Sequence, residues 1–182
     1  MSVKNARRPL GLSLLCAALL FVAACAAPNR DLPTLSSVEL DPARQQLAMM
    51  EVQQLQSKGH RVWCVPFARN VSGVNIRGNA NTWWGKAKGL YDRGSEPVVG
   101  AVMAFSATGK NPMGHVAVVS EVVSERQIKV DHANWKRNKV SLKMDVIDVS
   151  KNNDWSAVRL KSQPTAFGST YPITGFIYPQ QR

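Results

Sequence analysis

The stretch Gly114-His115-Val116-Ala117-Val118-Val119 and the run Gln127-Ile128-Lys129-Val130-Asp131-His132 carry the clearest fold signal in this 182-residue chain. Both are rich in β-branched residues and both follow a period of two, which predicts two strands. If they pair as a hairpin, the turn falls near residues 123–125. The pairing of these two runs sets which side chains share a face.

Two possible turn positions place the same side chains on the same face of the hairpin. A turn centred between Val123 and Ser124 sets His115 opposite His132, and one centred between Ser124 and Glu125 sets His115 opposite Asn134. In both registers His115, His132 and Asn134 share one face while Asp131 points to the other, because side chains alternate along a strand. A turn centred on a residue, or a β-bulge, would reverse the parity and bring Asp131 to the face of His115.

Helical patterns precede the hairpin. Asp41-Pro42 offers a helix start and Gly59 a stop, with two apolar rows (Ala43, Leu47, Met50 and Ala48, Val52, Leu55) expected to face the core. Further helices are expected across residues 62–72 and 81–91. Beyond Pro97 the period changes to two, and the candidate strands are 99–105, 115–123, 127–134, 143–149, 155–160 and 173–178. Helices followed by short strands favour an α+β domain with an antiparallel sheet.

The N-terminus has the layout of a secretory signal peptide over residues 1–24, with a basic start and the apolar run Leu10–Val22. The residues Val22-Ala23-Ala24-Cys25 resemble the lipobox of bacterial lipoproteins. That resemblance implies that Cys25 is lipidated and that residues 25–40 tether a domain, residues 41–182, to a membrane. In that family an Asp after the Cys commonly signals inner-membrane retention, so Ala26 at this position implies, for a host with two membranes, an outer-membrane lipoprotein facing the periplasm.

Charge and cysteine content become more specific once the signal is removed. Residues 1–24 hold three basic residues and no acid, so the formal charge falls from +11 to +8. A basic exported domain suits an anionic envelope polymer, and without zinc-finger, phosphate-loop or RNA-binding motifs no nucleic acid is expected. Cys16 lies in the signal and Cys25 at the lipobox, which leaves Cys64 as the one free thiol of the mature chain and excludes a disulfide framework or Cys-rich zinc site.

A lone exported thiol is either buried packing or a nucleophile. Cys64 lies at the start of an expected helix, where partial positive charge favours a thiolate. A catalytic thiol also needs a base and a group that orients the base. His60 is expected in a solvated loop, so His115 is the candidate base. His132 or Asn134 is the candidate orienting residue, and Asp131 takes that place only if the parity is reversed.

Five segments, in order, resemble the CHAP (cysteine, histidine-dependent amidohydrolase/peptidase) domain family across about residues 60–160. They are Trp63-Cys64-Val65-Pro66-Phe67-Ala68-Arg69, Gly78-Asn79-Ala80 with Trp83-Trp84, Pro97-Val98-Val99-Gly100-Ala101-Val102, Gly114-His115-Val116-Ala117-Val118-Val119 and Val130-Asp131-His132-Ala133-Asn134-Trp135. The resemblance implies a papain-like fold, with N-terminal helices packed on an antiparallel sheet.

The same resemblance implies a function. The expected activity is peptidoglycan hydrolysis, by an N-acetylmuramoyl-L-alanine amidase or an endopeptidase, with Cys64 as nucleophile, His115 as base and no metal or organic cofactor. Many members have Glu where this chain has His132, two positions before Asn134, so the third role stays between these two residues. The alternative is a catalytically silent wall-binding or scaffold lipoprotein with the same fold.

Overall fold

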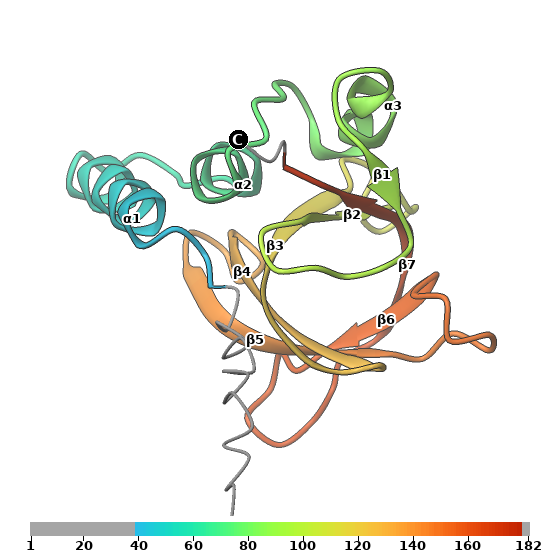
Figure 1. The fold of residues 1–182 in the computed structure, drawn as a ribbon. Coiled ribbons are helices and arrows are strands. Elements are labelled where there is room, and N and C mark those ends of the chain that lie inside the picture. The colour runs from blue at the N-terminus through green and yellow to red at the C-terminus, as the bar shows by residue number, and fades with distance from the viewer. Residues whose placement is uncertain (1–38, 180–182) are drawn as a thin grey trace, which may run out of the picture. The chain divides into compact units, whose positions relative to one another are not determined.

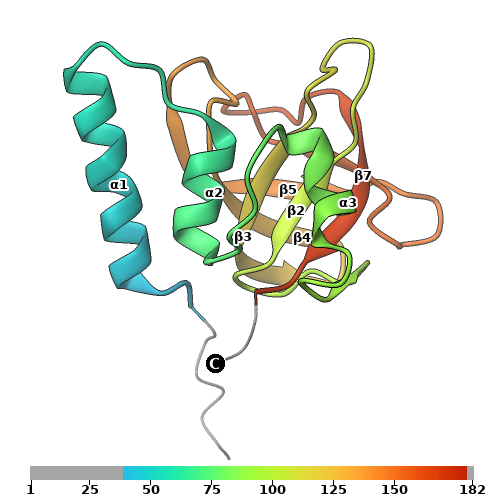
Figure 2. The same ribbon diagram turned by 90° about the horizontal axis from the view of Figure 1, so that it is seen from above.

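The computed structural model describes residues 39–179. The expected signal peptide, Cys25 and nearly all of the tether therefore lie outside the described residues. Within the described part, helices lie along one side of a strongly curved antiparallel sheet (Figures 1 and 2). The expected α+β class with an antiparallel sheet is confirmed. None of the helices in residues 39–179 has the length and apolar character that crossing a membrane requires.

The helices begin and end at residues that favour those ends. Helix α1 (Pro42–Ser57) begins after Asp41, whose side chain accepts hydrogen bonds from two backbone N–H groups. Helix α2 (Cys64–Ser72) ends at Gly73, which adopts a left-handed φ of 77°. The expected helix over 81–91 is shorter than predicted, because it consists of the 3-10 turn η1 (Ala80–Thr82) and α3 (Trp83–Ala87).

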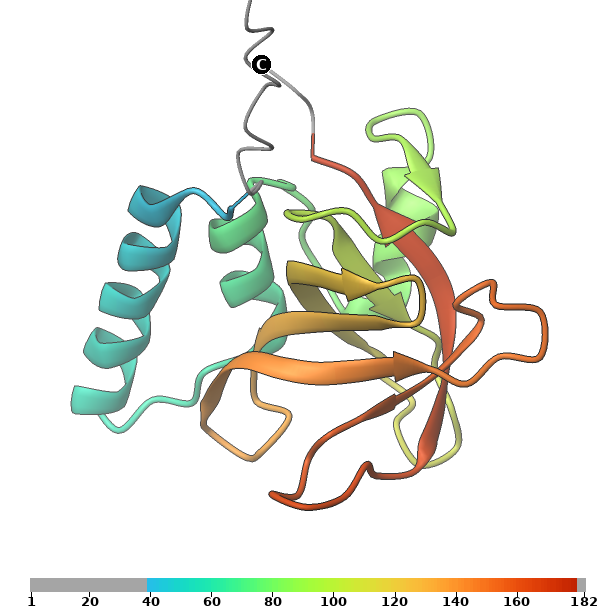
Figure 3. The same ribbon diagram turned by 60° about the horizontal axis from the view of Figure 1, so that its bottom comes forward.

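Seven strands form one sheet in the order β1-β7-β2-β3-β4-β5-β6, and β6 also pairs with β7. This last pairing closes the sheet into a barrel, as the curling of the orange and red strands in Figure 3 shows. All six strands expected from the sequence are present, and β1 adds a short edge that the sequence did not indicate. The strands are β1 (Arg93–Gly94), β2 (Val102–Phe105), β3 (His115–Ser124), β4 (Gln127–Ala133), β5 (Val140–Asp148), β6 (Ala157–Leu160) and β7 (Thr170–Ile177).

In the β3–β4 hairpin the side chains lie on the predicted faces, but the register that places them there differs from the predicted one. Its turn pairs Ser124 with Gln127, so neither predicted turn position is right. Two irregularities, between Val119 and Glu121 and between Val122 and Ser124, then shift the register, and Val118 pairs with Asp131. Each one-residue shift reverses the parity of the faces, so two restore it. His115 and His132 consequently lie on one face and Asp131 on the other.

Alternation along β3 divides the apolar residues between two cores. Val116 and Val118 pack with residues of the helices, whereas Ala117 and Val119 pack inside the barrel. Helix α2 lies directly on β3 and β4, and α1 packs mainly against α2. The sheet therefore has a filled interior and an outer face covered by α2, which places the start of α2 against the start of β3.

One expectation for α1 is wrong. Ala48 and Val52 are buried as expected, but Leu47 and Met50 of the other apolar row are 63% and 56% exposed. The reason is that α1 is the outermost element beside α2 (Figure 2), so only one narrow side of it has a neighbour to pack against.

The burial of the barrel interior predicts that truncating two leucines will change the free energy of unfolding by very different amounts. Leu160 is fully buried on β6, whereas Leu142 on β5 is 51% exposed. We expect Leu160→Ala to lower the free energy of unfolding by about 2–5 kcal/mol, and the matched Leu142→Ala to lower it by less than about 1 kcal/mol. Urea unfolding of the two variants measures both, and equal losses would contradict the described core.

Candidate active site

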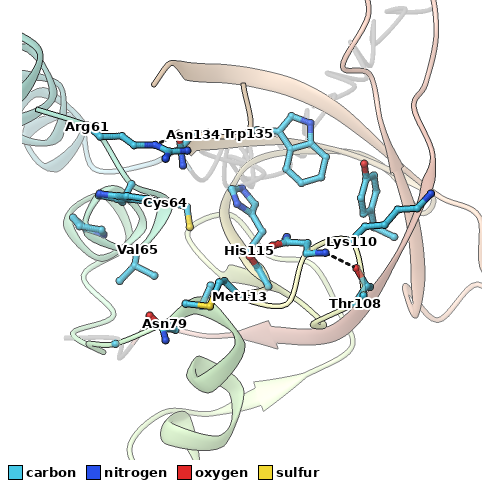
Figure 4. Close-up of a pocket in the computed structure, with 18 of the residues that line it drawn as sticks. Arg61, Cys64, Val65, Asn79, Thr108, Lys110, Met113, His115, Asn134 and Trp135 are labelled. Carbon is cyan, nitrogen blue, oxygen red and sulfur yellow. Dashed lines mark hydrogen bonds between the residues drawn. The ribbon is translucent and has the colours of Figure 1, made fainter. Parts of the chain in front are cut away.

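Cys64 is the first residue of α2, and it lines a pocket. The preceding Trp63 is extended, with φ −129° and ψ 151°, so the helix begins abruptly at the cysteine. Cys64 is partly buried and has no disulfide partner. Figure 4 shows its sulfur pointing toward the ring of His115, so the expected nucleophile and the expected base do lie together.

The thiol does not have the low pKa expected from the helix start alone. Burial raises the pKa of Cys64 above its usual value. The backbone N–H of Val116, followed by those of Val65 and Cys64 itself, pulls the pKa back down, but burial outweighs these contributions. The N–H groups at the helix start therefore do act on the sulfur, and the resting side chain is nevertheless a neutral thiol.

His115 is fixed at the first position of β3 by its neighbours. It pairs with Phe105 of β2, and the preceding Gly114 has a left-handed φ of 64°. A Cβ at Gly114 would lie 2.9 Å from the Phe105 carbonyl oxygen and 3.1 Å from the backbone nitrogen of Asn81. Only glycine fits this position without a shift of backbone, so the tight approach of η1 to the β2–β3 loop helps to orient the histidine.

The second histidine holds the first. The Nε2 atom of His115 lies 3.0 Å from Nδ1 of His132, a hydrogen-bond distance in a buried environment. The rings meet edge to face with their centroids 5.1 Å apart. Trp135 lies 5.0 Å from the His115 ring and stacks on His132 at 5.6 Å. With Nε2 engaged, Nδ1 is the ring nitrogen of His115 that remains available for proton exchange.

Burial keeps both imidazoles neutral. It lowers the pKa of His132 to about 3, and together with the neighbouring His132 it holds the pKa of His115 well below its usual range. The exposed fractions are 5% for His115 and 0% for His132. Since the pKa of Cys64 is raised as well, the pair rests as thiol and imidazole, without charge.

Asn134 and Asp131 have other partners. The side-chain oxygen of Asn134 accepts hydrogen bonds from Nε of Arg61 at 3.3 Å and from the backbone N–H of Asn138 at 2.9 Å. Asp131 accepts from Gln45 of α1 and from the backbone N–H of Lys143, on the far side of β4. Of the two candidates for orienting His115, only His132 has a hydrogen bond to it within the described residues.

A pocket of about 1150 Å³ surrounds the pair and draws on segments far apart in the sequence. Of the tryptophans in the CHAP-like segments, Trp135 lines this pocket, whereas Trp83 is fully buried and Trp84 lines a different pocket. The sequence reasoning missed several lining residues, of which only Arg61 carried a signal, being a cation close to Cys64. The missed residues include Arg61, Thr108, Lys110, Asn111, Met113 and Tyr171.

Residues 39–179 contain no group of three or more His, Cys, Asp or Glu side chains placed to hold a metal ion. The chemistry that the described side chains themselves offer is that of a thiol beside an imidazole, at the head of an open pocket. Such a pair supports nucleophilic attack on a carbonyl carbon.

The CHAP domain family matches residues 56–134, a span that includes Cys64, His115 and His132. This match supports a relationship between the chain and the CHAP family. It also supports a peptidoglycan-related hydrolase in general terms, since CHAP domains are typically amidohydrolases or peptidases. No curated protein matches the chain.

The raised pKa of Cys64 predicts how its alkylation depends on pH. We expect the rate of reaction with iodoacetamide to rise about tenfold per pH unit from pH 6 upward, as the thiolate fraction grows. The measurement is mass spectrometry of the proteolytic peptide that carries Cys64, taken from the full chain. A rate already at its plateau below pH 7 would show a resting ion pair and contradict the neutral state.

The lowered pKa of His132 predicts acid sensitivity. The unfolded chain takes up a proton at His132 near the ordinary value of 6.5, but the folded chain does so only at about 3. The stabilisation from burying the neutral ring is therefore complete above pH 6.5 and is lost as pH falls toward 3. We expect urea unfolding midpoints to fall over this window, less steeply in His132→Gln than in the parent or in His60→Gln, an exposed control. An equal dependence of the unfolding midpoint on pH in all three proteins would contradict the lowered pKa of His132.

Proposed function

We propose that the protein is a peptidoglycan hydrolase that cleaves an amide bond, as an N-acetylmuramoyl-L-alanine amidase or an endopeptidase, with Cys64 as nucleophile and His115 as base. The observation that carries the proposal is the convergence of three groups. The sulfur of Cys64 faces His115, and His115 is in turn held by His132 at 3.0 Å, at the head of an open pocket. The CHAP match supports the same substrate class.

The neutral resting pair defines the first chemical step. As Sγ of Cys64 attacks the amide carbonyl carbon, its proton passes to Nδ1 of His115. The carbonyl oxygen becomes an oxyanion, which the backbone N–H of Cys64 and a second, unassigned donor stabilise. Charge thus develops only when substrate has displaced water from the pocket.

The remaining steps return the site to its starting state. The tetrahedral intermediate collapses, the C–N bond breaks, and His115 gives its proton to the leaving amine, which leaves a thioester on Cys64. Neutral His115 then takes a proton from water while the water oxygen attacks the thioester carbon. When the C–S bond breaks, this proton returns to the sulfur, and the product is a carboxylic acid.

We assign the third role to His132. For His115 to accept a proton on Nδ1, its Nε2 must carry hydrogen and donate to Nδ1 of His132. His132 then carries its own proton on Nε2, a buried atom with no hydrogen-bond partner within the described residues. This neutral acceptor orients His115 without placing a full negative charge beside the imidazolium, as a carboxylate would.

The proposal also includes the domain architecture of the chain. Residues 41–182 form a papain-like catalytic domain, in which the helix that bears the nucleophile packs on an antiparallel sheet that bears the histidine. Residues 1–24 are a signal peptide, Cys25 is lipidated, and residues 25–40 tether the domain to the outer membrane from the periplasmic side. The supporting features are the lipobox-like Val22-Ala23-Ala24-Cys25 and the basic character of the chain.

Digestion of purified peptidoglycan tests the proposal. We expect the parent to release soluble fragments and Cys64→Ala to release none, because Cys64 carries the only thiol among the described residues that line the pocket. His132→Gln should lose at least about tenfold in kcat/KM through loss of orientation, whereas Asn134→Ala should lose less. Mass analysis of the fragments identifies the bond that is cut.

His60→Ala is the control, since His60 is exposed and does not line the pocket. Undiminished digestion by Cys64→Ala would refute the mechanism. A parent protein that binds peptidoglycan without cleaving it would instead support the alternative, a silent wall-binding lipoprotein.

A further inference from the structure

The cations that line the pocket lie on either side of the reactive pair. Arg61 precedes the nucleophile helix, and Lys110 comes from the loop between β2 and β3. Figure 4 shows them on opposite sides of Cys64 and His115. None of the pocket-lining residues is acidic, so a negatively charged group of a bound substrate would meet attraction from both sides and repulsion from neither.

Arg61 is exposed, and two contacts orient its guanidinium. Its guanidinium carbon lies 4.2 Å from the centre of the Trp63 ring, a cation–π distance. Its Nε donates to the side-chain oxygen of Asn134 at 3.3 Å. Asn134 follows the end of β4 and is itself tied to the backbone N–H of Asn138. The guanidinium is therefore fixed to the same strand end that supplies His132.

These contacts use one edge of the guanidinium and leave its fork available. No acceptor within residues 39–179 is recorded for the terminal nitrogens Nη1 and Nη2. Two parallel N–H groups of this kind match the two oxygens of a carboxylate. Because Arg61 lies three residues before Cys64 and lines the same pocket, the fork is placed to bind a substrate close to the nucleophile.

We propose that Arg61 is a specificity-determining residue that binds a free carboxylate of an acidic peptide next to the scissile amide. The inference rests on the proposed function, because it names the substrate chemistry of the same pocket. It implies that the protein prefers stem peptides with a free side carboxylate over those in which that group is amidated. Lys110 adds attraction for the anion, whereas Arg61 supplies the directional contact.

The test uses two synthetic muramoyl peptides that differ only in whether their acidic residue carries a carboxylate or a carboxamide. Binding is measured by calorimetry on the full chain with Cys64→Ala, and cleavage on the otherwise unchanged full chain. We expect the carboxylate peptide to bind and react about 10- to 100-fold better, mainly through KM, as for a charge-assisted bidentate contact. Arg61→Gln should reduce this preference to less than about threefold.

Two further variants separate the fork from charge alone. Arg61→Lys keeps the charge but lacks the planar fork and should retain only part of the preference. Arg137→Gln removes a charge from an exposed arginine that does not line the pocket, and it should keep the full preference. An unchanged preference in Arg61→Gln, or an equal loss in Arg137→Gln, would overturn the proposal.

The two measurements also separate this inference from the proposed activity. Arg61-dependent binding of the carboxylate peptide without any cleavage would refute the hydrolase while supporting the carboxylate site. Cleavage of both peptides at equal rates would support the hydrolase and overturn the role of Arg61. Binding of neither peptide to the Cys64→Ala chain would overturn the inference.

Discussion

The pairing of β3 with β4 is the constraint on which the site depends. Because side chains alternate along a strand, one uncompensated register shift would bring Asp131 to the face of His115 and turn His132 away. The structure contains two such shifts, and the second restores the parity of faces that the first reverses. As a result His115 and His132 meet inside the aromatic end of the barrel, while Asp131 serves as a structural acceptor for α1 and β5.

Burial explains both the order and the electrical neutrality of the site. The aromatic rings of Phe105, Trp135 and His132 surround His115 and leave it little freedom to turn. The same exclusion of water lowers the pKa of both histidines and raises that of Cys64. The free protein therefore holds a thiol and an imidazole in position, and the proposed mechanism separates charge only during attack on the substrate.

Each group of the proposed site is positioned by a different element. Cys64 comes from the start of α2, His115 from the start of β3, and Arg61 from the segment before α2. Asn134 links the end of β4 to the segment before α2, since it follows β4 directly and accepts a hydrogen bond from Arg61. We therefore propose that two residues at the end of β4 have different roles. His132 orients the base, and Asn134 holds Arg61 for recognition of the substrate.

The sequence by itself determined the α+β class, the start of α1 at Asp41-Pro42 and the place of Cys64 in the first turn of α2, because periodicity and capping act locally. It predicted that His115 and His132 share a face but left the reversed parity open, and only the register of β3 against β4 decided between the two. It did not determine which apolar row of α1 is buried, since that depends on where α2 lies. Nor could it choose between His132 and Asn134, because their hydrogen-bond partners come from other elements. The pKa of Cys64 was likewise decided by tertiary structure, because burial outweighs the backbone N–H groups at the helix start.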